Sequence, residues 1–527
     1  MGLLIVNHFI SVIIFSFLFT SSAWAETYHL EIAQKKISVN GVSAEKFTVN
    51  GTIPAPTLTF REGEQALIEV ANHLDEDTSI HWHGLLLPGE MDGVPGFNGF
   101  PGIKPGETFT YSFKLRQSGT YWYHAHSLGQ EQDGLYGAII VSPREKDRIE
   151  YDREYVLLLS EYSKENAVQI LGNLKMNSAY YNHAQRTIFD FFQDVKEVGL
   201  NAALQEALDW GEMRMSRTDL SDVSGYTFLI NGKSAEENWT GLFKKGERVR
   251  LRFINASAMS IFDVRIPGLK LTVVQADGQN VEPLIVDEFR FGVAETYDLV
   301  VTPQTEEVFT IVAEPIDRTG FALGTLASKG GMLGPMPQHR KRALLTMADM
   351  GGMHDMSTMD HSKHSMHDME SMQSGWADAD TPAGMKALSY SDLRSLEVQK
   401  YTAAPEREIV LHLDGNMERF IWTLNGKKFE ESEPIRLRYG ERIKITYVND
   451  SMMAHPMHLH GMFVQIDNGQ PPEKRPNKHT VIIPPGTSYS VFLTADEPGE
   501  WAFHCHLLYH MLSGMMTQVV VERPNAH

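Results

Sequence analysis

Three stretches of this chain carry the same markers in the same order, and this internal repeat constrains the fold more than any other feature. Each stretch has an Asn-Gly pair after a run of β-forming residues, then a Gly-Glu pair, then an Asn nine residues beyond the glycine of that second pair. The residues between the last two markers alternate polar and apolar, as half-buried strands do. The sequence therefore predicts one β-domain that occurs three times. The markers are Asn50-Gly51, Gly63-Glu64 and Asn72, then Asn231-Gly232, Gly246-Glu247 and Asn255, and finally Asn425-Gly426, Gly440-Glu441 and Asn449.

Histidine pairs separated by one residue lie in register in the first and third repeats. Nine residues after the marker Asn, these repeats read His81-Trp82-His83-Gly84 and His458-Leu459-His460-Gly461, whereas the middle repeat has Val264 and Ile266. Further along, His124-Ala125-His126 aligns with His504-Cys505-His506, and the middle repeat again has no pair. Imidazole suits copper, and three ligands per ion leave an open position for oxygen. We expect these eight histidines to meet between the terminal domains, with the middle domain as spacer and scaffold.

The only cysteine of the chain, Cys505, lies between two of these histidines and is followed by His510 and Met515. A Cys thiolate, two His and a long axial Met form the blue-copper electron-transfer site, and His455 is our candidate for the second His. Because side chains alternate along a strand, Cys505 would face one way and its two neighbours the other. One strand would then connect one copper to others. The alternative is a buried free Cys beside two surface histidines.

The sequence resembles the three-domain multicopper oxidases and, within them, the periplasmic copper-resistance oxidases of Gram-negative bacteria. The resemblance covers nearly all of the mature chain and implies an all-β fold of three cupredoxin-like Greek-key β-barrels. It also implies four copper ions: one type 1, one type 2 and two type 3. The motifs that carry it are His81-Trp82-His83-Gly84, His124-Ala125-His126, His455-Pro456-Met457-His458-Leu459-His460-Gly461 and the run from His504 to Met515.

The same resemblance implies a role for each candidate ligand. His455, Cys505, His510 and Met515 would bind the type 1 copper, and His81 and His458 the type 2 copper. His83, His124 and His506 would bind one type 3 copper, and His126, His460 and His504 the other. The implied enzyme takes single electrons from a reductant and reduces dioxygen to water. Its expected donors are Cu(I) and small organic reductants such as phenols, and other periplasmic copper-handling proteins are candidate partners.

Asp92 follows the first histidine pair within a loop rich in Gly and Pro. It could be a carboxylate that orients a His or a water and relays protons, because related oxidases keep an acid there. Alternatively, it is simply a turn Asp before Gly93.

The amino-terminal residues read as an export signal. Residues 10–20 are mostly apolar, and Ala23-Trp24-Ala25 is a small-x-small cleavage site. Relatives often carry a twin-arginine signal, which is missing here, so we expect general-secretory export and a periplasmic protein with no membrane segment after cleavage. An uncleaved anchor is the alternative. A single Cys allows no intrachain disulfide, and the net charge of −20 argues against nucleic acid and suits attraction of cations.

The repeats and motifs divide the chain into five segments. We predict a signal peptide over 1–25, domain 1 over 26–148, domain 2 without copper ligands over 149–330, a Met/His-rich linker over 331–403 and domain 3 over 404–527. Within domain 2, residues 164–218 break the β pattern, and helical spacing there predicts a helical insertion packed on the barrel. A core face is the favoured role of the spaced residues, and a substrate role is the alternative. These residues are Leu200, Ala203, Leu204, Ala207 and Leu208.

Eight methionines between Met347 and Met372 recur largely every third residue, interleaved with His354, His361, His364 and His367. Gly351-Gly352 and the lack of Leu, Ile or Val argue against a packed helix. Thioethers select Cu(I), and His-rich tracts bind metals. We therefore predict a flexible segment that captures additional Cu(I), with an inert linker as the alternative.

Two functions from other classes remain as alternatives to an oxidase. One is a copper-sequestering protein with little turnover, in which the Met/His-rich segment is the functional part. The other is a copper nitrite reductase, which uses related barrels but a single catalytic copper at a subunit interface. The complete set of eight histidines disfavours the first, and three repeats with histidine pairs in both terminal ones disfavour the second.

Overall fold

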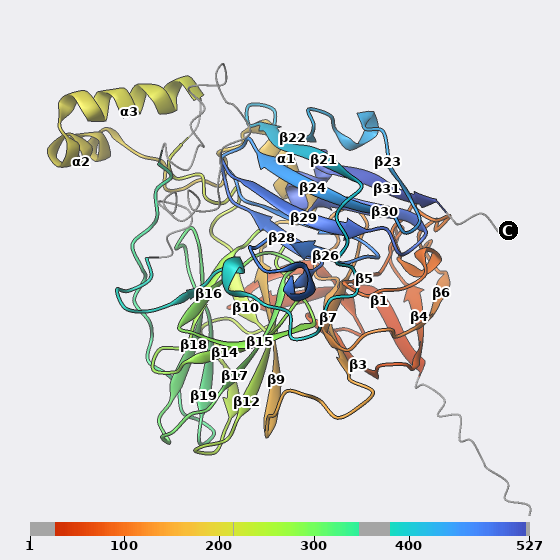
Figure 1. Cartoon of the computed structure of the whole chain (residues 1–527). Coiled ribbons are helices and arrows are strands. Elements are labelled where there is room, and N and C mark those ends of the chain that lie inside the picture. Colours follow the sequence, from red (N-terminus) through yellow and green to blue (C-terminus); the bar gives the residue numbers. More distant parts are fainter. Residues whose placement is uncertain (1–26, 214–215, 347–379, 523–527) are drawn as a thin grey trace, which may run out of the picture.

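The computed structural model describes residues 27–213, 216–346 and 380–522, and they form three pairs of β-sheets, one pair for each repeat (Figure 1). The predicted all-β fold of three barrels is confirmed. The expected signal peptide and the methionine-rich stretch from Met347 to Met372 lie outside the described residues. Within the described ranges, no helix combines the length and the apolar character that a membrane crossing requires.

The first barrel consists of two four-stranded sheets, with strand orders β2-β1-β4-β6 and β3-β8-β7-β5. Its strands are β1 (Thr27–Val39), β2 (Val42–Val49), β3 (Ala55–Arg61), β4 (Gln65–Asn72), β5 (His81–His83), β6 (Thr108–Lys114), β7 (Gly119–His124) and β8 (Tyr136–Ser142).

The second barrel has two six-stranded sheets, β10-β9-β12-β17-β14-β15 and β11-β19-β18-β13-β16-β20. Its strands are β9 (Arg153–Tyr162), β10 (Thr227–Ile230), β11 (Trp239–Leu242), β12 (Val249–Asn255), β13 (Phe262–Arg265), β14 (Leu271–Ala276), β15 (Gln279–Val286), β16 (Glu288–Phe291), β17 (Thr296–Val301), β18 (Phe309–Pro315), β19 (Ala322–Ala327) and β20 (Ala387–Leu388). The last of these comes from the segment expected to be a linker, so part of that segment is ordered and pairs with β16 at the edge of a sheet.

The third barrel pairs a six-stranded sheet, β22-β21-β24-β29-β26-β27, with a five-stranded sheet, β23-β31-β30-β25-β28. Its elements are β21 (Arg407–Asn416), β22 (Ile421–Leu424), β23 (Ile435–Arg438), β24 (Arg442–Asn449), β25 (His455–Leu459), β26 (Val464–Ile466), β27 (Asn477–Lys478), β28 (Thr480–Ile483), β29 (Ser488–Thr494), β30 (Gly499–Cys505), α4 (Leu508–Leu512) and β31 (Met516–Glu522).

The repeated Asn residues have the same structural role in each barrel. Asn50, Asn231 and Asn425 have positive φ angles of 51°, 51° and 53°, and the Gly after each is also positive, as hairpin turns of type I′ require. The second set, Asn72, Asn255 and Asn449, is buried. Each of these carboxamides donates to a loop carbonyl and accepts a backbone N–H two residues on, so it fixes the loop that leads into the next strand. The sequence repeat is therefore a repeat of turn and loop anchors.

The helical insertion lies between β9 and β10, and only part of it packs on the barrel. Helix α1 (Ala167–Met176) buries Ala167, Ile170 and Leu174. Helices α2 (Ile188–Val198) and α3 (Leu200–Met213) instead project from the body as a hairpin (Figure 1).

The expected core face of α3 is therefore wrong for most of its residues. Leu200, Leu204 and Leu208 are about half exposed, at 59%, 48% and 54%, whereas Ala203 is buried. The spacing correctly indicated a helix, but the two helices contact each other outside the barrel, which leaves these leucines in solvent.

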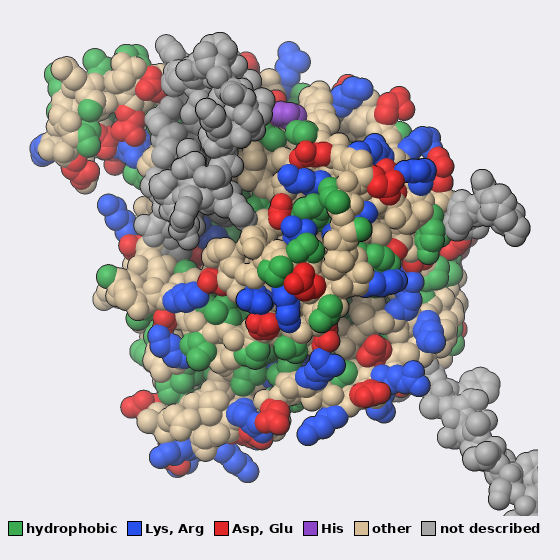
Figure 2. Space-filling model, in the orientation of Figure 1, with side chains coloured by type: hydrophobic (Ala, Val, Ile, Leu, Met, Phe, Trp, Pro, Cys, Tyr) green, Lys and Arg blue, Asp and Glu red, His purple; other side chains and the backbone are tan. Residues whose placement is uncertain are grey.

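The first and third barrels dock directly on each other. The Asn98 carboxamide donates to the Glu500 carbonyl at 2.6 Å and accepts from the Glu500 N–H at 2.8 Å, and Arg116 pairs with Glu497 at 2.7 Å. Figure 2 shows that acidic and basic side chains are interspersed over the displayed face despite the net charge of −20. The docking places β5 and β7 beside the third barrel, where the histidine motifs meet.

Candidate metal centre

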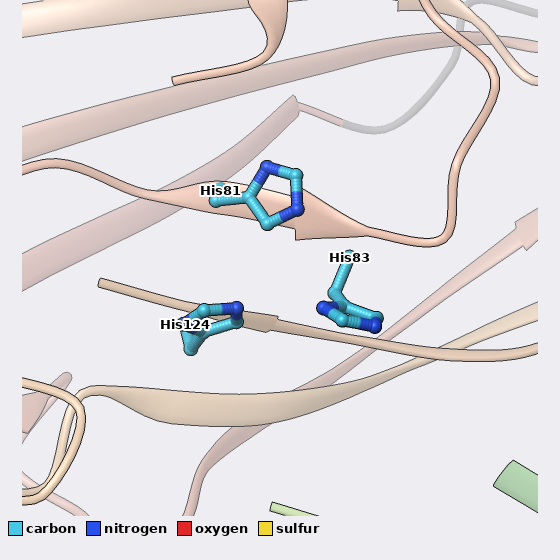
Figure 3. A group of neighbouring side chains, drawn as sticks. All are labelled: His81, His83 and His124. Carbon is cyan, nitrogen blue, oxygen red and sulfur yellow. The ribbon is translucent and has the colours of Figure 1, made fainter. Parts of the chain in front are cut away.

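Paired strands in the two terminal barrels hold the histidines in the same register. In the first barrel, β5 pairs with β7 so that His81 lies opposite His124, and Figure 3 shows these two residues with His83. In the third barrel, β25 pairs with β30 so that His458 lies opposite His504. The registers of the two barrels are equivalent.

The two sets interleave into one cluster between the barrels. His81 stacks on His460 and His83 stacks on His458, each pair with ring centroids 3.8 Å apart. The Nε2 atom of His504 lies 3.1 Å from that of His460 and 3.4 Å from that of His126. The structure thus brings together all eight histidines: His81, His83, His124, His126, His458, His460, His504 and His506.

The free ring nitrogens show that the cluster fits metal ions. One buried nitrogen in each of several rings has no hydrogen-bond partner, while the other nitrogen of the same ring is held by the protein. The unpartnered atoms are Nε2 of His81, His124, His458 and His506, and Nδ1 of His83; Nε2 of the neighbouring His479 is unpartnered as well. A buried lone pair without a donor is costly, and a metal ion satisfies several at once.

Burial also keeps these rings in the form that binds metals. Desolvation lowers the pKa of His83, His124 and His458 well below the usual value, and neighbouring imidazoles lower the pKa of each further. A neutral imidazole offers a lone pair, whereas a protonated one does not. These three rings are therefore neutral at neutral pH.

Two buried acidic side chains contact the rings from outside. Asp92 contacts a histidine of each barrel: its Oδ2 atom lies 2.9 Å from His460 Nδ1, and its backbone carbonyl lies 2.9 Å from His81 Nδ1. Glu131 lies 2.7 Å from His124 Nδ1, and burial raises the pKa of Glu131 well above its usual range. A carboxylate that accepts from the outer ring nitrogen fixes the tautomer of a metal ligand.

A second, smaller cluster surrounds Cys505 on the other side of β30. The Cys505 Sγ atom lies 3.5 Å from His455 Nδ1 and 3.7 Å from His510 Nδ1. Met515 is fully buried and its carbonyl accepts the Cys505 N–H at 3.1 Å. Burial raises the pKa of the Cys505 thiol, which therefore stays protonated until a metal displaces the proton. One thiol and two imidazoles in contact are the donor set of a blue-copper site.

The outer nitrogens of the second cluster are also held. His455 Nε2 lies 2.7 Å from the Ser451 hydroxyl, and His510 Nε2 lies 2.7 Å from Asp222 Oδ2. Asp222 belongs to the second barrel, in the irregular segment before β10, and burial raises its pKa to about 7. Trp422 stacks on His510 with ring centroids 3.8 Å apart and shields it from solvent.

Adjacent residues of one strand enter different clusters. Cys505 contacts His455 and His510, whereas its neighbour His504 contacts His126 and His460. In the middle barrel the equivalent strand positions hold Val264 opposite Ala313. The described part of the middle barrel thus contributes no histidine to either cluster at these positions.

Three residues at the clusters were not found by sequence reasoning: Glu131, Asp222 and His479. Glu131 lies in a turn after the second histidine pair, and Asp222 lies in a segment without a periodic pattern, so no spacing marks either. His479 lies 3.2 Å from His83, and burial lowers its pKa to about 4. His479 lies between two short strands of the third barrel, and it belongs to none of the repeated histidine motifs.

Comparison with known proteins gives matches along most of the chain. Family models described as multicopper oxidase match residues 31–146, 187–331 and 402–525. The chain is 46% identical to copper resistance protein A of Escherichia coli over 94% of this chain and 92% of that protein. It is 44% identical to a copper resistance protein A homolog of Pseudomonas syringae pv. tomato, with the same coverage of both chains.

A solved structure shares the fold at low sequence identity. The crystal structure of Fet3p, a multicopper oxidase that functions in iron import, is similar with a TM-score of 0.70 and 20% identity. The similarity covers 94% of this chain and 90% of that one.

Proposed function

Because this chain belongs to the multicopper oxidase family, we propose that it is a periplasmic oxidase which oxidises Cu(I) and reduces dioxygen to water. Four one-electron oxidations of substrate accompany the reduction of one dioxygen with four protons to two waters. Oxidation of phenols is a side activity, and copper detoxification is the physiological role. The observation that carries the choice of Cu(I) is a polar cavity beside His510.

The assignment of ligands follows the two clusters. We assign the type 1 copper to His455, Cys505, His510 and Met515, and the type 2 copper to His81 and His458. One type 3 copper takes His83, His124 and His506, and the other takes His126, His460 and His504. Bound copper supplies one-electron redox chemistry and the positions for dioxygen. The chain supplies the imidazole rings, the connection through Cys505, and Asp92, which contacts rings of both barrels.

The cavity has the chemistry of a Cu(I) site. It has a volume of about 320 Å³ and is lined by Asn182, Gln185, Ser216, Asp219, Asp222 and Met417, among others. Burial raises the pKa of Asp219 only to about 6, so its carboxylate is mostly ionised at pH 7 and attracts a cation, and the Met417 thioether is the soft ligand that Cu(I) prefers. Arg186 also lines the cavity, but it pairs with Asp194 at 2.5 Å. Because Asp222 contacts His510, a donor held here lies against the type 1 ligand set.

The two alternative functions are less well supported. A sequestering protein needs no connected clusters, yet Cys505 and His504 are adjacent residues of one strand in two clusters. A copper nitrite reductase would need a catalytic copper shared between subunits, whereas here both halves of the large cluster come from one chain.

The test is steady-state oxygen uptake with Cu(I) and with a bulky phenol, using Asp219→Asn and Met417→Leu. We expect the KM for Cu(I) to rise about tenfold, as for a loss of about 1.4 kcal/mol of binding, with kcat and the phenol KM little changed. Asp75→Asn, which removes an exposed acid on the first barrel, is the matched control. Equal changes with both donors would contradict Cu(I) binding in this cavity.

A deletion tests whether the methionine-rich segment recruits substrate. Removal of Met347 to Met372 should lower the efficiency of Cu(I) oxidation, because the thioethers that concentrate Cu(I) are gone. Phenol oxidation should stay unchanged or rise. At equal copper loading, an equal loss with both donors would mean that the segment is structural, and no loss with Cu(I) would mean that it is an inert linker.

A further inference from the structure

His479 is a ninth histidine at the edge of the large cluster, and the proposed ligand set does not use it. It lies between β27 and β28 of the third barrel, and its side chain is buried. Its ring centroid is 4.7 Å from that of His83 and 5.7 Å from that of His458.

Two proposed ligands on different copper ions depend on this one residue. The His479 carbonyl lies 2.7 Å from Nδ1 of His458 and accepts its proton. The Nδ1 atom of His479 lies 3.2 Å from Nε2 of His83. In both ligands the opposite nitrogen is buried without a partner, Nε2 in His458 and Nδ1 in His83. His479 therefore holds the outer nitrogens while the inner ones remain free.

The ring of His479 lies between His83 and Gly84. Its Nδ1 atom faces His83, and its other edge faces Gly84, the last residue of the first histidine motif. A Cβ atom on Gly84 would lie 2.5 Å from His479 Cδ2 and 2.7 Å from its Nε2. The glycine of that motif thus leaves room for the His479 ring, and its φ of +81° also favours glycine. The Nδ1 atom of His479 has partners in His83 and Thr480, whereas its Nε2 atom is buried without a hydrogen-bond partner.

The middle barrel holds His479 in place. Asp277, in the turn between β14 and β15, accepts the backbone N–H groups of His479 and Thr480 through Oδ2, each at 3.1 Å. The buried ammonium of Lys478 lies 3.1 Å from Asp277 and 2.9 Å from Glu295, both on the middle barrel. These contacts fix the segment 478–480 against a domain that supplies no proposed ligand.

We propose that His479 is a positioning residue through which the middle barrel, by way of Asp277, sets the orientation of His83 and His458. This inference rests on the proposed copper assignment of those two ligands. It gives the middle barrel a direct part in the metal centre. Residues that orient metal ligands in this way typically change metal affinity by about 10–100-fold when they are replaced.

The experiment compares His479→Leu with His479→Asn in the full chain. Leucine removes the acceptor at the place of Nδ1, whereas the asparagine carboxamide keeps one there. Thr480→Val removes the second nearby acceptor, whose hydroxyl lies 3.3 Å from His83 Nε2. His73→Leu, which replaces an exposed histidine of the first barrel, is the control. The readouts are copper bound per chain during titration, the type 2 electron paramagnetic resonance signal, and the visible Cys-to-copper absorption.

His479→Leu should weaken copper binding at the large cluster about 10–100-fold, because His83 loses its acceptor. The type 2 signal and the visible absorption should be unchanged, because the His479 carbonyl still accepts from His458. His479→Asn should restore most of the affinity, and Thr480→Val should have a smaller effect than His479→Leu. The proposal is overturned if His479→Leu matches His73→Leu, or if His479→Asn is as impaired as His479→Leu. If His479→Leu fails to fold, the comparison of His479→Asn with Thr480→Val decides between the same outcomes. A wild-type chain that binds no copper would instead refute the proposed function.

Discussion

The third and middle barrels carry different kinds of side chain at the same strand position. In the third barrel, Cys505 lies opposite Met457 on the paired strand. In the middle barrel, the equivalent residue is Glu314, which lies opposite Asp263. Both positions are buried. In the third barrel this buried position therefore holds a thiol that contacts two imidazoles. In the middle barrel the same position holds one member of a pair of carboxylates.

The carboxylates of the middle barrel are neutralised by guanidinium groups. Asp263 pairs with Arg290 at 2.8 Å and with Arg318 at 2.7 Å. Burial alone would raise the pKa of Asp263, but these two cations lower it below its usual value. Glu314 pairs with Arg265 at 2.8 Å. A buried polar side chain is costly unless it has a partner. The third barrel meets this need with a metal donor set, and the middle barrel meets it with ion pairs.

The first barrel has an apolar residue at this position. The residue equivalent to Cys505 there is Ala125, which belongs to the apolar core of that domain. The fold itself therefore does not require a metal at this position. What distinguishes the third barrel is the convergence of His455, Cys505 and His510.

The largest expected effect comes from removing the thiol. Cys505→Ser should abolish the intense thiolate-to-copper absorption and all turnover, because the site loses both its soft ligand and the connection to the large cluster. The copper of the large cluster should stay. Visible spectroscopy and copper analysis check this, and a variant that remains blue would show that Cys505 is not the ligand.

The next effect tests the symmetry between the two terminal barrels. His81→Ala and His458→Ala remove residues at equal repeat positions, so each should remove the same copper, leave the blue site intact and stop oxygen reduction. Electron paramagnetic resonance measures this loss. A full type 2 signal in either variant would refute the pairing of these two histidines.

A smaller effect is expected in the middle barrel. Glu314→Gln should lower the free energy of unfolding by about 3 kcal/mol, because Arg265 loses its buried counterion. Copper content and colour of the folded protein should not change. Differential scanning calorimetry gives the shift, and the double variant Glu314→Leu/Arg265→Leu should regain much of the stability. Loss of copper at full stability would mean that this position also supports a metal site.

The last expected effect is a change of pH dependence at a buried acid whose partners are neutral. Glu161 accepts the Met259 N–H at 3.0 Å and bonds to the Ser260 hydroxyl, and burial raises its pKa from 4.5 to about 8. The folded state then binds more protons than the unfolded state, so the stability that protonated Glu161 contributes is lost as the pH rises from about 4.5 to 8. Glu161→Gln should reduce this dependence by at most about 1.4 kcal/mol per pH unit. Denaturant unfolding at several pH values measures it, and identical profiles would contradict the raised pKa.

Sequence reasoning succeeded where local geometry sets the pattern. The Asn-Gly turns predicted three β-domains because only a few residues tolerate positive φ in a hairpin turn. The periodicity of α3 likewise predicted a helix. It could not predict that Leu204 and Leu208 are exposed, because periodicity says which residues share a face and not what covers that face.

By itself, the sequence determined the three-fold repeat, the register of the histidine pairs and the division of β30 between two faces, because strand alternation and turn chemistry are local properties. Tertiary structure alone decided that Asp222 contacts His510, that Glu131 contacts His124, and that Asp277 supports His479. Each of these contacts joins segments with no shared periodicity, and two of them cross between barrels. Only the docking of separately patterned domains, driven by burial of their facing surfaces, brings such groups within hydrogen-bond distance.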